Sequence, residues 1–393
     1  MEAHIIEWLN LSVRWVHMIT GIAWIGASFY FIFLENNLNR TQNLRTELAG
    51  NLWAVHGGGF YYLEKYKHSP EKIPKDLHWF KWEAYFTGIT GFILLFIVYY
   101  YNANLYMIDP NIADISIFQA VSIGIGTLLG GWIIYDLMCK SALVNKSKLF
   151  ALVAFGLIIA LTYGLNQLIS AKAAYIHIGA MIGTIMVANV FFVIIPSQKT
   201  MVNAAIKGEK SDPTLGKKAL TRSIHNNYMT LPVLFIMISN HFPSTFGHKN
   251  SWLVLAGLII VGASIRHWFN LNGKGVKNYW ILPFAISLLI ILVIYTKPQT
   301  NIETPQTTKV VSDMQVMQII DQHCLSCHAA QPNSTIFAQA PKGLMFDSFD
   351  SIKANKDQIK AQTVSSHLMP LGNTTNMTEK ERQKLGRWIE LLE

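Results

Sequence analysis

The residues whose spacing is most specific for chemistry lie near the C-terminal end, in the stretch Cys324-Leu325-Ser326-Cys327-His328. In this C-x-x-C-H pattern, each cysteine can form a thioether with a haem vinyl group, and His328 can reach the haem iron as proximal ligand. A zinc knuckle is disfavoured because the only other cysteine, Cys139, is solitary. A thioredoxin-like dithiol is disfavoured because no βαβ pattern surrounds the motif. The sequence therefore predicts a covalent c-type haem and one-electron transfer. Because bacteria attach this haem outside the cytoplasm, we expect the segment to lie there.

A sixth ligand for the haem iron is expected from a methionine, as in electron-transfer cytochromes c. We predict Met369, because it precedes Pro370 in a pairing that resembles the axial methionine of small cytochromes c. Met345 is the second candidate, and Met377 is expected to pack in the core. The alternative for Met369 is a core position beneath the haem.

The composition indicates a membrane protein. Of the 393 residues, 51% are hydrophobic and only 14% are charged, whereas about a quarter are charged in soluble proteins. The apolar residues form long runs, as in membrane-spanning helices. The net charge of +9 fits basic cytoplasmic loops, so it does not imply nucleic-acid binding. Glu2 and Glu7 precede the first apolar run, which therefore does not read as a cleaved signal peptide.

We expect eight membrane spans, at about residues 8–34, 82–101, 117–138, 149–168, 173–195, 227–241, 252–269 and 279–295. The sixth is short, contains Pro232 and is expected to begin nearer Arg222. Nearly all Lys and Arg residues between spans follow the first, third, fifth and seventh spans. This asymmetry places those loops in the cytoplasm of a bacterial inner membrane and both termini outside, in agreement with the haem motif.

The C-terminal region is expected to fold separately. Residues 297–312 are polar, contain two prolines and read as an extended linker. They connect a membrane domain, residues 1–296, to a compact domain, residues 313–393. Thr378 and Glu381 form a capping box. It begins an amphipathic helix with one apolar face, made by Leu385, Trp388, Ile389 and Leu392. The fold class predicted is all-α: an eight-helix membrane domain followed by a small class I cytochrome c.

Ionisable side chains inside membrane spans are costly and therefore mark candidate sites. One group, expected near the outer face, comprises His17, His177 and His241. His17 and His177 could hold a b-type haem between two spans as its axial ligands. The alternative is that each is a buried histidine satisfied by hydrogen bonds.

A second group, expected near the cytoplasmic face, comprises His56, His78, Glu83, His225, Arg266 and His267. Arg266 with Asn226 and Asn227 could bind an anionic, amide-rich molecule, and His225 or Glu83 could move a proton. The candidate catalytic residues are His225, Asn226, Arg266, Glu83 and His56. The glycines after His56 suggest a close backbone approach, or a turn at the membrane surface. The alternative for the whole group is anchoring at the lipid interface.

Six stretches resemble the bacterial membrane-bound urate hydroxylases, also called cytochrome c-linked urate oxidases. They are residues 14–17 with 22–28, 53–60, 78–83, 183–190, 223–228 and 238–241. The resemblance implies oxidation of urate to 5-hydroxyisourate, with the hydroxyl group supplied by water. It also implies that electrons pass to the haem c and on to a downstream cytochrome c or terminal oxidase.

Two other functions are compatible with the sequence. The chain could be an electron-transfer subunit that takes electrons from quinol or from a partner dehydrogenase, or a transporter with a cytochrome appended. No G-x-G-x-x-G fingerprint for flavin or nicotinamide is present. A direct electron jump across a bilayer core of about 30 Å would be very slow. The donor of electrons must therefore lie near the outer face, or a second cofactor must relay them.

Overall fold

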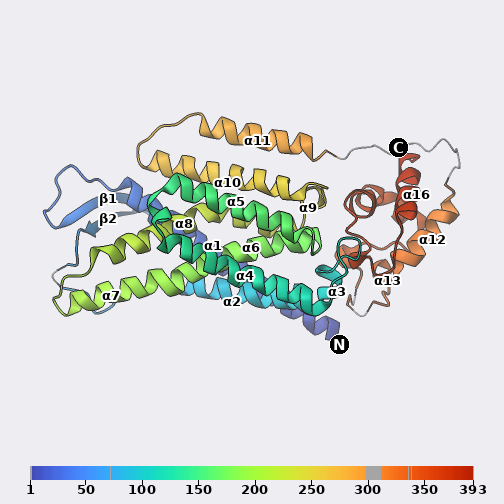
Figure 1. Cartoon of the computed structure of the whole chain (residues 1–393), viewed down its shortest axis with the longest axis horizontal. Coiled ribbons are helices and arrows are strands. Elements are labelled where there is room, and N and C mark those ends of the chain that lie inside the picture. Colours follow the sequence, from blue (N-terminus) through green and yellow to red (C-terminus); the bar gives the residue numbers. More distant parts are fainter. Residues whose placement is uncertain (1, 71, 298–310, 335, 338, 393) are drawn as a thin grey trace.

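The computed structural model describes residues 2–70, 72–297, 311–334, 336–337 and 339–392. Within these residues, a long bundle of helices carries a smaller helical domain at one end and a β-hairpin at the other (Figure 1). We call the end that meets the smaller domain the docked end. It is formed by α3 (Ala103–Tyr106), α9 (Pro243–Phe246) and the beginning of α6 (Ala171–Ala188).

The main helices of the bundle follow the apolar runs of the sequence. They are α1 (Glu2–Asn37), α2 (Trp82–Leu95) with its π-helical continuation η1 (Phe96–Tyr100), α4 (Ile117–Lys140), α5 (Ser147–Leu165), α6 with η3 (Asn189–Ile194) and α7 (Ile195–Ile206), α8 (Pro213–Ser239), α10 (Ser251–Gly273) and α11 (Ile281–Tyr295). The fifth predicted span is longer than expected, because α7 carries the same rod on to Ile206.

Six helical segments in the described part are long and apolar enough to cross a membrane: α1, α2 with η1, α4, α5, α6 through α7, and α10. This is compatible with a multi-pass membrane protein. The sixth and eighth predicted spans fall on α8 and α11, which are outside these six. Helix α8 begins at Pro213, well before the predicted start, and its first half is polar. The count of eight spans therefore stays a prediction.

Helix α6 forms the centre of the bundle and is buried along most of its length. It packs against α4 and α8 through glycines that allow close approach. A Cβ on Gly131 of α4 would lie 2.3 Å from Met181 Cγ, and one on Gly179 would lie 2.5 Å from Ile236 Cγ2. Larger residues at either glycine would push these helices apart.

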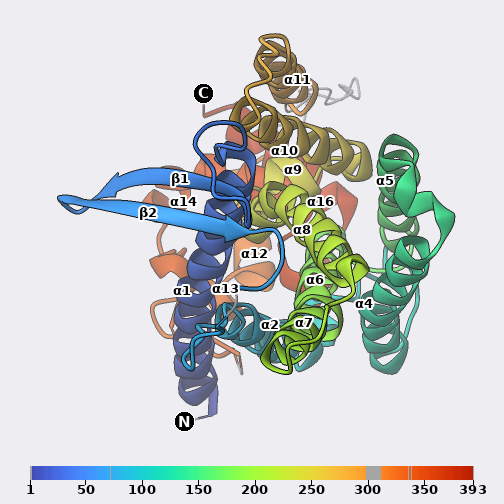
Figure 2. The ribbon, with the colours of Figure 1, turned by 90° about the vertical axis from the view of Figure 1, so that its left-hand side faces the viewer.

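The segment between α1 and α2 contains a β-hairpin, which corrects the all-α prediction. Strand β1 (Leu48–His56) pairs antiparallel with β2 (Gly59–Tyr66). Gly57 and Gly58 form the two-residue turn with φ of 57° and 77°, which suits the type of turn that favours glycine. An added Cβ at either would meet nothing within 4 Å. The expectation of a close backbone approach here was wrong, since the turn explains the glycines. Figure 2 shows the hairpin projecting sideways from the bundle.

The C-terminal domain is built from short helices around its own apolar core. Its elements are α12 (Asp313–His323), α13 (Leu325–His328), η4 (Pro341–Gly343), α14 (Phe349–Ala354), α15 (Lys356–Ile359), η5 (Lys360–Ser365), η6 (Leu371–Asn373) and α16 (Glu379–Glu390). The predicted capping box of Thr378 and Glu381 is confirmed at the start of α16. Leu385, Trp388 and Ile389 are buried in the core, and Leu392 packs against it. The indole of Trp388 donates to Asp313 Oδ1 at 2.9 Å and so ties α16 to α12.

The C-terminal domain packs directly on the docked end. Gly372 in η6 lies on α3, where an added Cβ would be 3.0 Å from the carbonyl oxygen of Asn104. Beside α9, a Cβ on Gly247 would lie 2.5 Å from Ser366 Cβ. Leu368 packs against the core of the bundle. These contacts place the haem motif next to the bundle rather than at the end of a free tether.

Candidate functional site

A cavity of about 1640 Å³ lies between the bundle and the C-terminal domain. Its walls come from α1, α2, α6 and α8 on one side and from the haem motif on the other. Cys324, Cys327, His328 and Met369 all line it. Two regions far apart in the sequence therefore enclose the same space.

The histidine of the haem motif is oriented by the backbone. His328 Nδ1 lies 2.8 Å from the carbonyl oxygen of Leu344. Because a carbonyl only accepts, Nδ1 carries the proton, and Nε2 keeps the lone pair that an iron ligand needs. The ring also stacks on Phe346, with centroids 4.9 Å apart. Cys324 and Cys327 are free of disulfides, and burial raises the pKa of the Cys324 thiol to about 12.

Met369 is the methionine of the three candidates that lines the cavity. Its carbonyl oxygen accepts a hydrogen bond from Arg382 Nη1 at 2.6 Å. Met345 is 45% exposed and Met377 is buried in the domain core, and neither lines the cavity. Two thiols, an imidazole and a thioether facing one cavity fit a covalently bound haem. Among the described residues, no group of three or more His, Cys, Asp and Glu side chains could hold a metal ion by itself.

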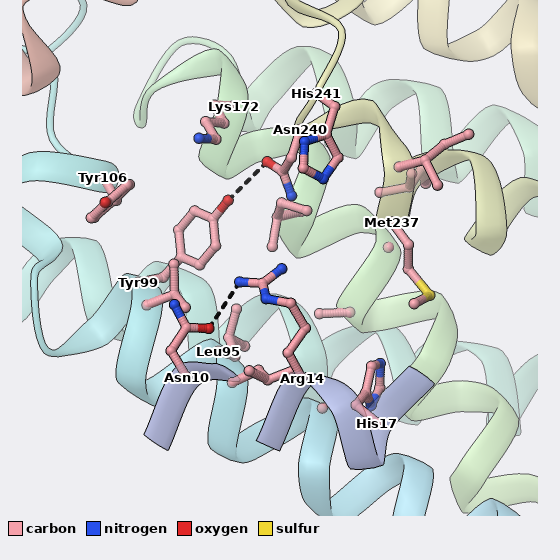
Figure 3. A pocket seen from close by; sticks show the side chains of 18 of the residues that line it. Asn10, Arg14, His17, Leu95, Tyr99, Tyr106, Lys172, Met237, Asn240 and His241 are labelled. Atoms are coloured by element: carbon pink, nitrogen blue, oxygen red, sulfur yellow. Dashed lines mark hydrogen bonds between the residues drawn. The ribbon is translucent and has the colours of Figure 1, made fainter. Parts of the chain in front are cut away.

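The charged side chains around the cavity are all cations. Arg14, Lys172 and Lys342 line it, and no carboxylate does among the described residues. Arg14 Nη2 donates to Asn10 Oδ1 at 3.0 Å, as drawn in Figure 3. Neither Arg14 nor Lys172 was among the candidate site residues predicted from the sequence. A signal was present, because Lys172 is one of only two lysines in the loops that are otherwise free of basic residues.

Neutral polar groups complete this part of the cavity. The hydroxyl of Tyr99 donates to Asn240 Oδ1 at 3.1 Å (Figure 3). The Lys172 ammonium lies 5.6 Å from the centre of the Tyr106 ring. His241 also lines the cavity. The arrangement gives a planar anion both positive charge and hydrogen-bond donors.

The structure does not bring His17 and His177 around one space. His17 lines the cavity, with Nδ1 3.1 Å from Thr87 O. His177 is fully buried, and its Nδ1 donates to Ala173 O at 2.8 Å. Its Nε2 has no hydrogen-bond partner among the described residues and faces Gly124, where an added Cβ would lie 2.6 Å away. His177 therefore lies outside the cavity that His17 lines. The haem b stays a prediction.

Of the five residues predicted as catalytic, His225 and Asn226 share one hydrogen-bond network through Tyr135 and Asn189. His225 Nδ1 lies 2.9 Å from the Tyr135 hydroxyl. Asn226 is bonded to Met186 O and to Asn189. Glu83 lies in the first turn of α2, and His56 is exposed at the hairpin tip. None of these residues lines the cavity.

The remaining residues of the predicted cytoplasmic group are also held elsewhere. Arg266 donates to Asn227 Oδ1 at 2.8 Å and to Asn270 Oδ1 at 3.1 Å. His267 is paired with Tyr228, and the His78 ring packs on Phe80. Several members of this predicted group are therefore hydrogen-bonded to neighbouring side chains, and the substrate pocket there stays a prediction.

A family profile described as "Urate oxidase N-terminal" matches residues 3–297. The chain belongs to the urate oxidase N-terminal family. The match spans the whole bundle and its hairpin, whereas the C-terminal domain lies outside it. Membership of this family indicates an oxidoreductase acting on urate. Neither the comparison with curated proteins nor that with solved structures found a match.

Proposed function

We propose that this protein is a membrane-bound urate hydroxylase that passes electrons to a covalent haem c. In the balanced reaction, urate and water yield 5-hydroxyisourate, two electrons and two protons. The observation that carries the proposal is the shared cavity: the bundle that matches the urate oxidase family and the C-x-x-C-H motif line the same space.

The residues of the C-terminal domain define how a haem would be held. Cys324 and Cys327 would form the two thioethers, and His328 and Met369 would supply the axial ligands. When bound, the haem accepts one electron at a time. The Leu344 carbonyl holds the His328 ring in the tautomer that can ligate. The Arg382 guanidinium holds the backbone at Met369.

The shared cavity supports a short path for electrons between the substrate and the haem. A substrate bound in this cavity would lie on the same side of the membrane as the haem, so electrons would not need to cross the bilayer core of about 30 Å. The basic loops lie at the opposite end of the bundle, which supports a docked end that faces outward from a bacterial inner membrane. A downstream cytochrome c or terminal oxidase would then take the electrons.

The proposal is tested by adding urate without oxygen to the purified, oxidised protein. Since urate gives two electrons and each haem accepts one, half an equivalent of urate should reduce all of the haem c and yield 5-hydroxyisourate. A Cys324→Ala, Cys327→Ala variant, which lacks the haem attachment sites, should bind urate without oxidising it. Reduction by quinol but not by urate would refute the proposal and favour the electron-transfer subunit.

A further inference from the structure

The three cations of the cavity lack anionic partners. The charges of Arg14 and Lys342 both act on Lys172, so the three side chains repel one another. In the described part of the chain, none of them forms an ion pair with a carboxylate. Like charges close together in a partly closed cavity repel one another, so the protein has a higher electrostatic energy when no anion is bound there. A bound anion would relieve this repulsion.

Two buried arginines of the bundle, unlike the more exposed Arg14, already have side-chain hydrogen-bond partners. Arg222 is 2% exposed and donates to Asp136 Oδ1 at 2.6 Å and to Asn189 Oδ1 at 3.1 Å. Arg266 lies between two asparagine side chains. Arg14, by contrast, makes one side-chain hydrogen bond to the part of the chain that the structure describes, to Asn10 Oδ1. A guanidinium has five N–H donors, so most of those of Arg14 are left for a ligand.

Two amides around the cavity present donors as well. Asn10 Oδ1 accepts from Arg14, and Asn240 Oδ1 accepts from Tyr99. Since both oxygens are engaged, the NH₂ group of each amide is left to donate. Such donors suit the carbonyl oxygens of an oxidised purine, whose negative charge is spread over a planar ring.

We propose that the urate monoanion binds at the docked end of the cavity, between Arg14 and Lys172. Asn10 and Asn240 donate to its carbonyl oxygens. Lys342 approaches from the C-terminal domain, so the site is complete only when that domain is docked. This inference rests on the proposed function and adds the place where the substrate binds, next to Cys327 and His328 on the cavity wall.

The test is urate binding to protein reduced with dithionite, in which the haem cannot accept electrons and urate is not consumed. We expect Arg14→Gln and Lys172→Gln each to weaken binding roughly 10- to 100-fold, because each removes a charge-assisted hydrogen bond of about 1.5–3 kcal/mol. Lys249→Gln is the matched control, because Lys249 lies exposed between α9 and α10 and does not line the cavity. Lys172→Arg keeps the charge and should retain most of the affinity. Haem content reports correct folding of each variant.

Haem propionates are carboxylates too and could use the same cations. If they did, Arg14→Gln and Lys172→Gln would shift the haem midpoint potential and leave urate affinity unchanged, which would overturn the inference. Wild-type affinity in both glutamine variants, at an unaltered potential, would overturn it as well. In both cases urate would still reduce the wild-type haem. Failure of the proposed function is distinct, because urate would then not reduce the wild-type protein at all.

Discussion

Replacing Arg382 should remove the methionine ligand from the haem iron and leave the covalent attachment of the haem intact. Arg382 Nη1 donates to the carbonyl oxygens of Thr363 at 2.5 Å and Met369 at 2.6 Å, and the side chain is 3% exposed. Hydrogen bonds to a charged group contribute about 1.5–3 kcal/mol each. Two such bonds give roughly 3–6 kcal/mol, and desolvation of the guanidinium lowers the net value. We expect Arg382→Ala to destabilise the C-terminal domain by about 3 kcal/mol.

The same change should release the backbone that presents Met369. The absorption band of methionine bound to ferric haem iron should then be lost, and the midpoint potential should fall, since a methionine ligand raises it. The covalent haem should remain, because Cys324 and Cys327 are untouched. Thermal unfolding followed by haem circular dichroism measures the stability change.

The control is Arg387→Ala, on the same helix, where the side chain is half-buried and makes no side-chain hydrogen bond to the described residues. It should keep both the absorption band and the potential. An Arg382→Ala protein with an unchanged band and potential would show that the hydrogen bonds to the Met369 loop do not position the ligand.

Three further predictions concern stability and docking. Gly372→Ala places a side chain at φ 61° against α3. We expect a cost of roughly 1–2 kcal/mol, a looser interface and slower haem reduction by urate in stopped-flow measurements; an unchanged rate would contradict this. Asp136→Ala leaves the Arg222 guanidinium buried without its carboxylate. The unfolding free energy of the bundle should fall by about 3–5 kcal/mol, and a thermal midpoint equal to that of wild type would exclude the effect. Hydrogen bonds from Thr378 lower the pKa of Glu381. Their stabilisation is present above the unfolded pKa of about 4.3 and is lost as pH falls through the lower folded value. Melting curves of Glu381→Gln should show a weaker decline in acid than wild type.

Local patterns in the sequence predicted the parts of the structure that depend on neighbouring residues. The apolar runs marked the helices of the bundle, and the capping box of Thr378 and Glu381 marked the start of α16. The hairpin was missed although Gly57 and Gly58 favour its turn. The sequence left two interpretations of this stretch open, a close backbone approach and a turn at the membrane surface, and neither of them predicts paired strands.

The site was harder to predict because its parts come from distant segments. Arg14 and Lys172 belong to different helices, and Lys342 belongs to another domain. Nothing in the sequence states that α1 and α6 face each other across a cavity. The sequence placed His225 and Asn226 among the candidate catalytic residues. It could not show that Tyr135 and Asn189 already occupy their hydrogen bonds.

The packing of Gly372 on α3, and of Gly247 against Ser366 of the C-terminal domain, has a kinetic consequence. A diffusing acceptor must collide with its donor, so the rate of transfer depends on the concentrations of both. Here the proposed acceptor is part of the same chain and is held against the donor site, so its effective concentration is independent of dilution. The rate constant for reduction of the proposed haem by bound substrate should then not depend on the protein concentration. The first bimolecular encounter after substrate binding would be with the soluble or membrane carrier that reoxidises it.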